Sequence, residues 1–176
     1  MKIPGPQMLA CLAIIVASGI ALGKEINSMS STKDEQAIRA KFAQTSQGNA
    51  ELDVAKATAM YKAAGEDLLV FDLVPPLEDK GFQKAAIEKT TRFFKGVKGT
   101  ALVEYKDLQV HVDHDMAYAT YHLHFAFMTK DGKKADVTGR GTDVFRRVHG
   151  DWGVIHEHTS LPTVVGFSWS EAGGAQ

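Results

Sequence analysis

Cysteine is almost absent from this sequence, and its scarcity excludes several kinds of site. Cys11 is the only cysteine in 176 residues, and it lies inside an apolar N-terminal segment. If that segment is removed on export, the rest of the chain has no thiol nucleophile, no thiolate metal ligand and no disulfide. The stability of the folded chain must then come from the packing of its core.

The sequence also lacks an excess of charge of either sign. Lysine and arginine number 20 against 21 acidic residues, so the formal net charge is −1. No basic stripe interleaved with aromatic residues is present, and nucleic acid is therefore not an expected partner. A chain this close to neutral is better suited to a small apolar or weakly anionic ligand.

Only one long apolar run occurs, MLACLAIIVASGIAL at residues 8–22. It follows Lys2, is short for a membrane span, and ends in small residues that suit a signal peptidase. We therefore interpret residues 1–23 as a secretory signal peptide cleaved near Gly23. This predicts a secreted or periplasmic protein that has no membrane contact after cleavage. The alternative is an uncleaved N-terminal anchor, because two prolines precede the run.

The sequence after the signal peptide has the composition of a single domain. Residues 24–32 form a polar leader, residues 33–163 carry helical and strand patterns, and residues 164–176 form a C-terminal tail. Neither an internal repeat nor a linker interrupts the middle segment. Its length suits one domain with a core of its own.

Apolar spacing predicts three helices in the first part of this domain. Ser31 or Thr32 can cap the first, and Gly65 can end the second. The first two helices are expected at 32–49 and 50–64, and the third is expected to run from Gly81 to Gly96. A short strand is expected at 67–72, between the second and the third helix.

From Thr100 onward the apolar period changes to two, which is typical of strands. The connections DHD, KDGK and HGD are short enough to join antiparallel neighbours. Helices followed by an antiparallel meander predict the α+β class, with the helices on one face of a curved sheet. The strands are expected at 101–112, 117–128, 135–148 and 152–160.

Three motifs resemble SnoaL-like proteins: VFDLVPPLEDKG, KDGKKADVTGRGTDVFRR and GDWGVIHEHTSLP. These proteins belong to the nuclear transport factor 2-like superfamily, which includes ketosteroid isomerase, limonene epoxide hydrolase and scytalone dehydratase. The last motif is also similar to the end of the calcium/calmodulin-dependent kinase association domain. The resemblance covers about residues 33–163. It implies a cone in which a strongly curved antiparallel sheet surrounds an apolar pocket and three helices close one side.

The resemblance also implies a homodimer formed through the outer face of the sheet. One face of the strand at 117–128 is almost wholly apolar, and the opposite face carries Thr120, His122 and His124. An apolar face of this extent must be covered, either by the core of the domain or by a partner. Its members are Ala117, Ala119, Tyr121, Leu123, Phe125 and Phe127.

Similarity to ketosteroid isomerase points to two aspartates as catalysts. Asp72 ends a strand where the isomerase carries its proton-shuttling aspartate, and partial desolvation would raise its pKa and make it a base. Asp143 lies in GTDVFRR, which resembles the strand bearing the isomerase's protonated aspartate, a hydrogen-bond donor to an oxyanion. The alternatives are an Asx turn at Asp72 and a salt bridge from Asp143 to an arginine. The isomerase also uses a tyrosine on its first helix, and the corresponding IRAKFAQTSQ has none.

Arg140 belongs to an R-x-T pattern that resembles SnoaL-like proteins. An arginine inside a strand either meets an anionic ligand or pairs with a carboxylate such as Glu157. Alternation places Arg140 and Asp143 on opposite faces unless a bulge intervenes. We assign Arg140, Glu157, Thr120 and His122 to ligand binding and leave open which face of this strand lines the pocket.

Two His-x-His pairs suggest a metal site, because imidazole is the commonest metal ligand. They are His122 with His124 and His156 with His158. The strand at 135–148 would separate the pairs by about 9–10 Å, so we expect no metal ion and no other cofactor. His156 is expected to be structural, whereas His158 suits a structural and a ligand-facing role equally.

These features predict an exported protein whose pocket binds a small, mostly apolar molecule. As an enzyme it would be a cofactor-independent isomerase, cyclase or dehydratase. Asp72 would take a proton from carbon, and Asp143, or His158 in its place, would stabilise the charge that develops on oxygen. The alternative is a non-enzymatic ligand-binding or dimeric assembly domain of the same fold.

Overall fold

The computed structural model describes residues 32–72 and 77–162. The predicted signal peptide, almost all of the polar leader and the whole C-terminal tail lie outside the described residues, so these assignments stay predictions. Within the described ranges, no helix has both the length and the apolar character needed to cross a bilayer.

The first two predicted helices are present, but the second is broken. The first helix spans residues 32–51 and is followed by α2 (Val54–Ala57) and the 3₁₀ helix η1 (Ala59–Asp67). Leu52 has a positive φ of 57° and interrupts the helical path. Asp53 then caps α2, because its side chain accepts a hydrogen bond from the backbone N–H of Lys56. The second helix therefore begins later than predicted.

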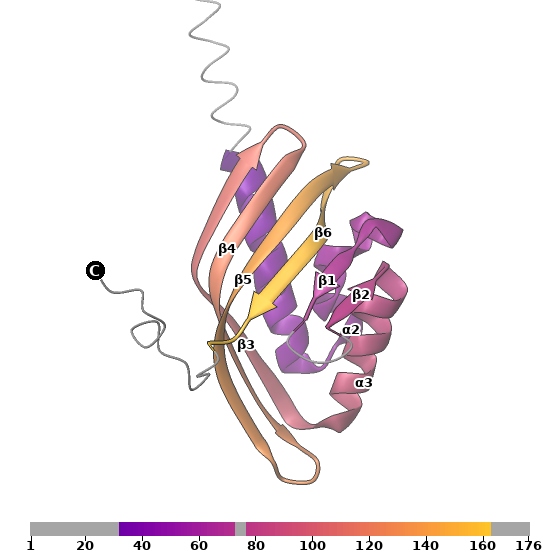
Figure 1. Cartoon of the computed structure of the whole chain (residues 1–176), viewed down its shortest axis with the longest axis vertical. Helices are drawn as coiled ribbons and strands as arrows, with labels where there is room; N and C mark the ends of the chain where they lie inside the picture. Colours follow the sequence, from indigo (N-terminus) through magenta and orange to yellow (C-terminus); the bar gives the residue numbers. More distant parts are fainter. Residues whose placement is uncertain (1–31, 73–76, 163–176) are drawn as a thin grey trace, which may run out of the picture.

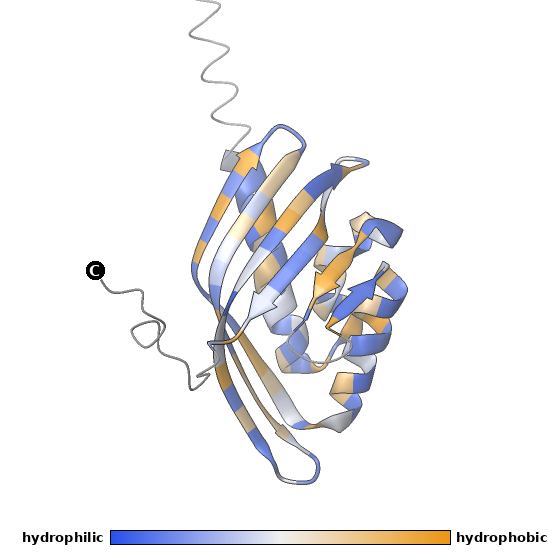
Figure 2. Cartoon of the chain, in the orientation of Figure 1, coloured by the Kyte–Doolittle hydropathy of each residue, from blue (hydrophilic) through white to orange (hydrophobic). Residues whose placement is uncertain are grey.

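The third predicted helix follows Gly81 and has two parts. The π-helical turn η2 (Phe82–Glu88) continues into α3 (Lys89–Gly96). Before it, β1 (Leu69–Phe71) and β2 (Glu78–Lys80) form an antiparallel pair. The first of these two strands lies within the predicted 67–72, and the second was not predicted. Figure 2 shows that β1 is apolar and β2 is hydrophilic.

The predicted meander is confirmed. Its strands are β3 (Val97–Asp113), β4 (Met116–Thr129), β5 (Lys134–Val148) and β6 (Asp151–Ser160), paired antiparallel in sequence. The full order is β2-β1-β6-β5-β4-β3, so the sheet is open, with β2 and β3 at its edges. The pairing of β1 with β6 is parallel, which makes the sheet mixed rather than wholly antiparallel. The α+β class and the strong curvature are confirmed (Figure 1).

The helices lie on one side of the curved sheet, and the core lies between them (Figure 1). Phe42 of the first helix is buried, and its ring meets the edges of Tyr105, Tyr121 and Phe145 at centroid distances of 4.8, 5.4 and 5.8 Å. Trp152 is buried with them, as predicted. The chain's own helices thus cover the apolar face of β4. That face does not require a partner, and the homodimer stays a prediction.

A one-residue β-bulge in β6 changes which side chains face the helices. Val144 pairs with His156, whereas the next residue of β5, Phe145, pairs with Val154, so Ile155 is the extra residue. Trp152 and Val154, before the bulge, are buried. After it the alternation is reversed, because an inserted residue shifts the parity of a strand. Glu157 and Thr159 therefore face inward, and His156 and His158 face outward.

Gly141 is required where β5 passes beneath Tyr121. A Cβ atom at this position would lie 2.4 Å from carbon atoms of the Tyr121 ring. We expect Gly141→Ala to lower the free energy of unfolding by about 1–3 kcal/mol, because the overpacked core must shift. Equilibrium urea unfolding measures the loss. Gly96→Ala is the control, since a Cβ there meets nothing within 4 Å, and equal stability of the two variants would contradict the prediction.

Candidate functional site

A cavity of about 760 Å³ lies between η2–α3 and the concave face of the sheet. Much of its sheet wall comes from β4 and β5, which Figure 1 shows extending past the end of β6 and curving toward α3. Its walls are mainly apolar: Phe93 of α3 lies 5.4 Å from Phe125 and 5.0 Å from Phe127 between ring centroids. Other apolar lining residues are Val70, Ala85, Ala86, Ala135, Val137 and Leu161.

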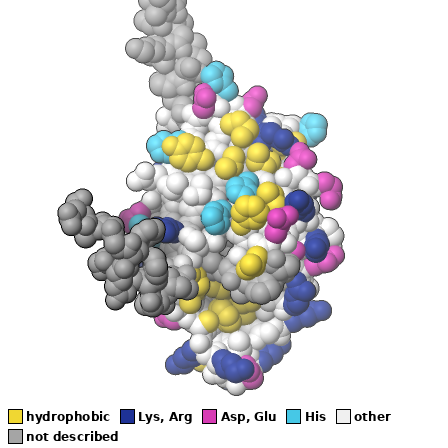
Figure 3. Space-filling view, viewed as in Figure 1, with side chains coloured by type: hydrophobic (Ala, Val, Ile, Leu, Met, Phe, Trp, Pro, Cys, Tyr) yellow, Lys and Arg dark blue, Asp and Glu magenta, His cyan; other side chains and the backbone are white. Residues whose placement is uncertain are grey.

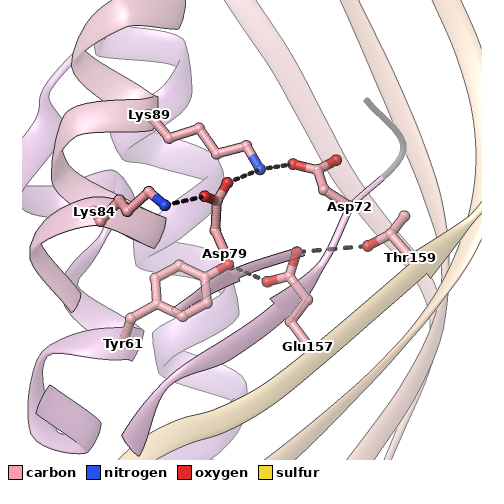
Figure 4. Close-up of polar contacts among 7 residues, drawn as sticks. All are labelled: Tyr61, Asp72, Asp79, Lys84, Lys89, Glu157 and Thr159. Atoms are coloured by element: carbon pink, nitrogen blue, oxygen red, sulfur yellow. Dashed lines mark hydrogen bonds and ion pairs between the residues drawn. The ribbon is translucent and has the colours of Figure 1, made fainter. Parts of the chain in front are cut away.

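The polar end of the cavity brings together four side chains from different elements. They are Tyr61 of η1, Asp72 after β1, Lys89 of α3 and Glu157 of β6 (Figure 4). Tyr61 Oη donates a hydrogen bond to Glu157 Oε2, and Thr159 Oγ1 lies 3.5 Å from Glu157 Oε1 as a second donor. Both carboxyl oxygens of Glu157 are thus held by hydroxyl groups, which fixes its orientation.

The ionisation of Glu157 is shifted by its surroundings. Burial raises the pKa of the Glu157 carboxyl, and the hydrogen bond from Tyr61 and the charge of Lys89 oppose this only in part. Burial and the Glu157 carboxyl also raise the pKa of Tyr61 well above its usual range. Tyr61 consequently stays protonated and acts as the hydrogen-bond donor to Glu157.

Asp143 lies directly across from Glu157 in the β5–β6 register. It is only 1% exposed and does not line the cavity. Tyr121 Oη donates to Asp143 Oδ1 over 3.1 Å, but Oδ2 has no hydrogen-bond partner among the described residues. Burial, reinforced by the charge of Glu157, raises the pKa of Asp143 well above its usual range. Asp143 is therefore a neutral acid behind the cavity wall.

Lys89 joins the site to the edge of the sheet. Its ammonium forms an ion pair with Asp72 and a second, at 3.2 Å, with Asp79 of β2 (Figure 4). Burial opposes the charge of Lys89, but the hydrogen bonds and charges of these two carboxylates outweigh it and raise its pKa. Asp79 is also 3.6 Å from Lys84. Asp72, the predicted base, is thus engaged by a fixed cation, and the Pro75–Pro76 loop after it lies outside the described residues.

The side of the molecule formed by η2 and α3 also carries cations. Figure 3 shows lysine and arginine side chains gathered along the side of the molecule where η2 and α3 lie. Arg92 of α3 lines the cavity itself. With Lys89 it balances the two acids of the lining, Asp72 and Glu157, so the cavity has no excess of charged groups of either sign.

The structure divides the predicted site residues between two faces of the sheet. Asp72 and Glu157 line the cavity, whereas Arg140, Thr120, His122 and His158 line a separate cleft on the outer face. The bulge in β6 turns His158 outward, so it cannot replace Asp143 beside the cavity.

The structure also decides between the alternatives for Arg140 and Asp143. The two lie on opposite faces, as alternation predicts, because β5 pairs with β4 without a register shift at this point. Among the described residues, Arg140 has no ion pair with Glu157, and Asp143 has none with an arginine.

The two histidine pairs are separated by β5, as predicted. In the part of the chain that the structure describes, no group of three or more His, Cys, Asp or Glu side chains is placed to hold a metal ion. His156 has the structural role expected of it, since its Nδ1 lies 3.2 Å from the carbonyl oxygen of Leu69 on the neighbouring strand.

A family model for the SnoaL-like domain matches residues 35–164. The chain belongs to the SnoaL-like domain family. No curated protein matches it.

Solved structures agree with this assignment. A nuclear transport factor 2-like protein of unknown function from Pseudomonas putida is 28% identical, with a TM-score of 0.64, over 80% of this chain and 92% of that one. A superfamily protein from Salmonella enterica is 17% identical, with a TM-score of 0.67, over 78% and 97%. A Novosphingobium aromaticivorans protein provisionally named a scytalone dehydratase is 14% identical, with a TM-score of 0.64, over 78% and 89%.

Sequence reasoning missed three polar residues of this SnoaL-like site: Tyr61, Asp79 and Lys89. Tyr61 lies within the predicted helix 50–64, and the usable signal was that a buried tyrosine hydroxyl usually has a polar partner. Lys89 follows Phe82 by seven residues and precedes Phe93 by four, so it lies on the same helix face as these two apolar residues. A lysine on the buried face of an amphipathic helix was therefore a usable signal. Asp79 lies in a strand that no periodicity indicated.

The raised pKa of Asp143 predicts a dependence of stability on pH. Its folded-state pKa exceeds that of the unfolded chain, so the folded state binds more protons. Asp143 makes its full contribution to the free energy of unfolding below the unfolded-state pKa of about 3.9. That contribution is lost as the pH rises through the folded-state pKa. Asp143→Asn cannot ionise, and its stability relative to the parent domain should rise from about pH 4 to pH 8.

Urea unfolding of both proteins at several pH values measures this difference. Asp115→Asn, which removes an exposed carboxyl near Arg147, is the control and should show no such gain. A constant difference between Asp143→Asn and the parent domain across the pH range would show that Asp143 is ionised in the folded state.

Proposed function

We propose that this SnoaL-like domain binds a small, mostly apolar molecule in the cavity and that Glu157 transfers a proton to or from it. The observation that carries the proposal is the position of the Tyr61–Glu157 pair at the polar end of an otherwise apolar cavity of about 760 Å³. That size and lining are typical of small-molecule sites.

Glu157 suits the role of general base better than Asp72. Its pKa is raised by burial, which brings a carboxyl closer to the pKa at which a base works well near neutral pH. Asp72 is instead held by the ammonium of Lys89, which occupies the carboxylate that a substrate would have to reach. The proton-transfer role that the sequence suggested for Asp72 is therefore proposed for Glu157.

A cofactor-independent isomerisation follows from this arrangement. Glu157 takes a proton from a carbon next to a carbonyl group, and the electron pair of the C–H bond moves to the carbonyl oxygen. Lys89, a fixed cation at the same end of the cavity, stabilises the resulting oxyanion. Glu157 then returns the proton to another carbon, or to a departing hydroxyl group in a dehydration. Similar solved structures that are provisionally named dehydratases support this class of chemistry.

The second candidate is a protein that captures the same kind of ligand without transforming it. The observation that favours it is the double ion pair of Lys89 with Asp72 and Asp79, which satisfies the ammonium within the protein. A lysine held in this way serves to close the end of the pocket. Export through the N-terminal segment and a homodimer remain part of either proposal.

Ligand binding in the cavity can be tested by filling it. Val137 lines the cavity, whereas the next residue of β5, Thr138, is exposed on the outer face. We expect Val137→Trp to weaken binding of the fluorescent anion anilinonaphthalene sulfonate by about tenfold or more, because the indole occupies the apolar space. Thr138→Trp is the matched control and should bind the dye like the parent domain. Equal binding by both variants would place the dye outside the cavity.

Proton transfer can be tested by deuterium exchange at carbon. A panel of small cyclic ketones is incubated with the protein in D₂O, and proton NMR follows exchange of the hydrogens next to the carbonyl. The parent domain should accelerate the exchange, and Glu157→Gln should reduce the acceleration by about a hundredfold or more, the usual contribution of a positioned base. His158→Gln, on the outer face, should have no effect.

Two other outcomes would change the assignment. If Asp72→Asn abolished exchange while Glu157→Gln retained it, Asp72 would be the base, as the sequence resemblance implies. If the ketones displaced the dye but no variant or parent accelerated exchange, the cavity would be a capture site.

A further inference from the structure

A second concave site lies on the outer face of the sheet, away from the cavity. It has a volume of about 510 Å³ and is built on the middle of β4, β5 and β6. Cross-strand pairing arranges its side chains in two rows: His122 beside Arg140 beside Ser160, and Thr120 beside Thr142 beside His158. Adjacent members of a row come from strands about 4.8 Å apart, so six polar groups share one small area.

Arg140 at the centre of this cleft has no carboxylate partner among the described residues. Its only hydrogen bond there is a long one, 3.4 Å from Nε to Ser160 Oγ. The other arginine that β5 presents on this face, Arg146, is paired with Asp67. Thr120, Thr142 and His158 likewise have no side-chain hydrogen bond to the described part of the protein. The donors of the cleft are therefore available to a ligand.

One carboxylate, Asp107, lines the cleft itself, and it and the neighbouring acids Glu104 and Asp136 contact histidines. Glu104 and Asp136 hold the two ring nitrogens of His124 at 2.8 and 2.9 Å. Asp107 lies 2.9 Å from His122 Nδ1. None of these acids forms an ion pair with Arg140 in the part of the chain that the structure describes.

A bulge in β3 produces the contact between Asp107 and His122. The register with β4 shifts between Lys106 and Gln109, and Asp107 adopts a positive φ of 53°. This places its carboxylate at His122 Nδ1 and leaves Nε2 without a partner among the described residues.

We propose that this outer-face cleft binds a phosphate group, either free or as a small phosphate monoester. A guanidinium fork with two free nitrogens matches an oxyanion in geometry and charge. The hydroxyl groups of Thr120, Thr142 and Ser160 and the imidazole of His158 add donors in excess of what a carboxylate with two oxygens can accept. The cleft volume falls in the range of small-molecule pockets, which leaves room for the organic part of an ester.

The proposed anion site is independent of the cavity chemistry. Arg140 and Asp143 lie on opposite faces of the same strand, so the sheet itself separates the cleft from the Glu157 cavity. The two sites do not share a charged residue, and failure of one proposal leaves the other in place. An exported domain with both sites could bind two different molecules at once.

Phosphate binding can be measured with the ¹⁵N-labelled full chain by titrating inorganic phosphate and, separately, phenyl phosphate at constant ionic strength. Saturable shifts are expected at the backbone amides of Gly141 and Thr142 and not at those of α3. Arg140→Gln should weaken binding by about tenfold or more, since hydrogen bonds between charged groups are lost. Tighter binding of phenyl phosphate identifies the monoester as the ligand, and equal binding identifies the free anion.

Arg146→Gln is the matched control, because it removes the same charge from the same face of β5 where the arginine has a carboxylate partner. It should bind phosphate within about twofold of the parent domain, as expected for an arginine outside the ligand contacts. Equal weakening by both variants would show non-specific charge attraction and overturn the proposal. So would acetate binding as tightly as phosphate.

Oligomeric state provides a further check on the same samples. If sedimentation showed a dimer that Arg140→Gln dissociates and that phosphate does not affect, the cleft would be an interface between two copies and the anion proposal would be wrong. A phosphate-dependent shift in a monomer, or in a dimer that Arg140→Gln leaves intact, supports it.

Discussion

The placement of Glu157 depends on one extra residue in β6. Ile155 forms a bulge against β5, so the strand presents Trp152 and Val154 to the core and then Glu157 to the cavity. The same shift turns His158 outward. Parallel pairing with β1 then sets Glu157 beside Val70, two residues before Asp72, while its other neighbour across the sheet is Asp143. A strict alternation along β6 would bury two histidines and expose the glutamate.

Two neighbouring carboxyl groups inside a protein repel each other if both are ionised, so one of them tends to keep its proton. Here Asp143 holds a proton because burial and the charge of Glu157 raise its pKa, and its one hydrogen-bond donor is Tyr121. Glu157 accepts hydrogen bonds from two hydroxyl groups, and the positive charge of Lys89 favours its ionised form. Asp143 thus remains neutral behind the cavity wall, and Glu157 is the acid that a ligand in the cavity can contact.

The two faces of the sheet differ in how their charges are satisfied. On the concave face, Lys89 pairs with Asp72 and Asp79, and Glu157 accepts a hydrogen bond from Tyr61. On the outer face, Glu104, Asp107 and Asp136 contact histidines, and Arg140 is left with a hydroxyl group as its only described partner. This difference explains why residues that a single pocket was expected to unite are separated into a cavity and a cleft.

The sequence by itself determined the α+β class, the four long strands with their antiparallel order, and the burial of Trp152. These follow from apolar period, turn chemistry and alternation, which are local properties of a chain. Only the tertiary structure decided that Glu157 faces the cavity, that Lys89 holds Asp72, and that β1 joins β6 in parallel. Each of these depends on a bulge or on contacts between distant segments, and a one-residue shift in register changes no local pattern while it moves every following side chain to the other face.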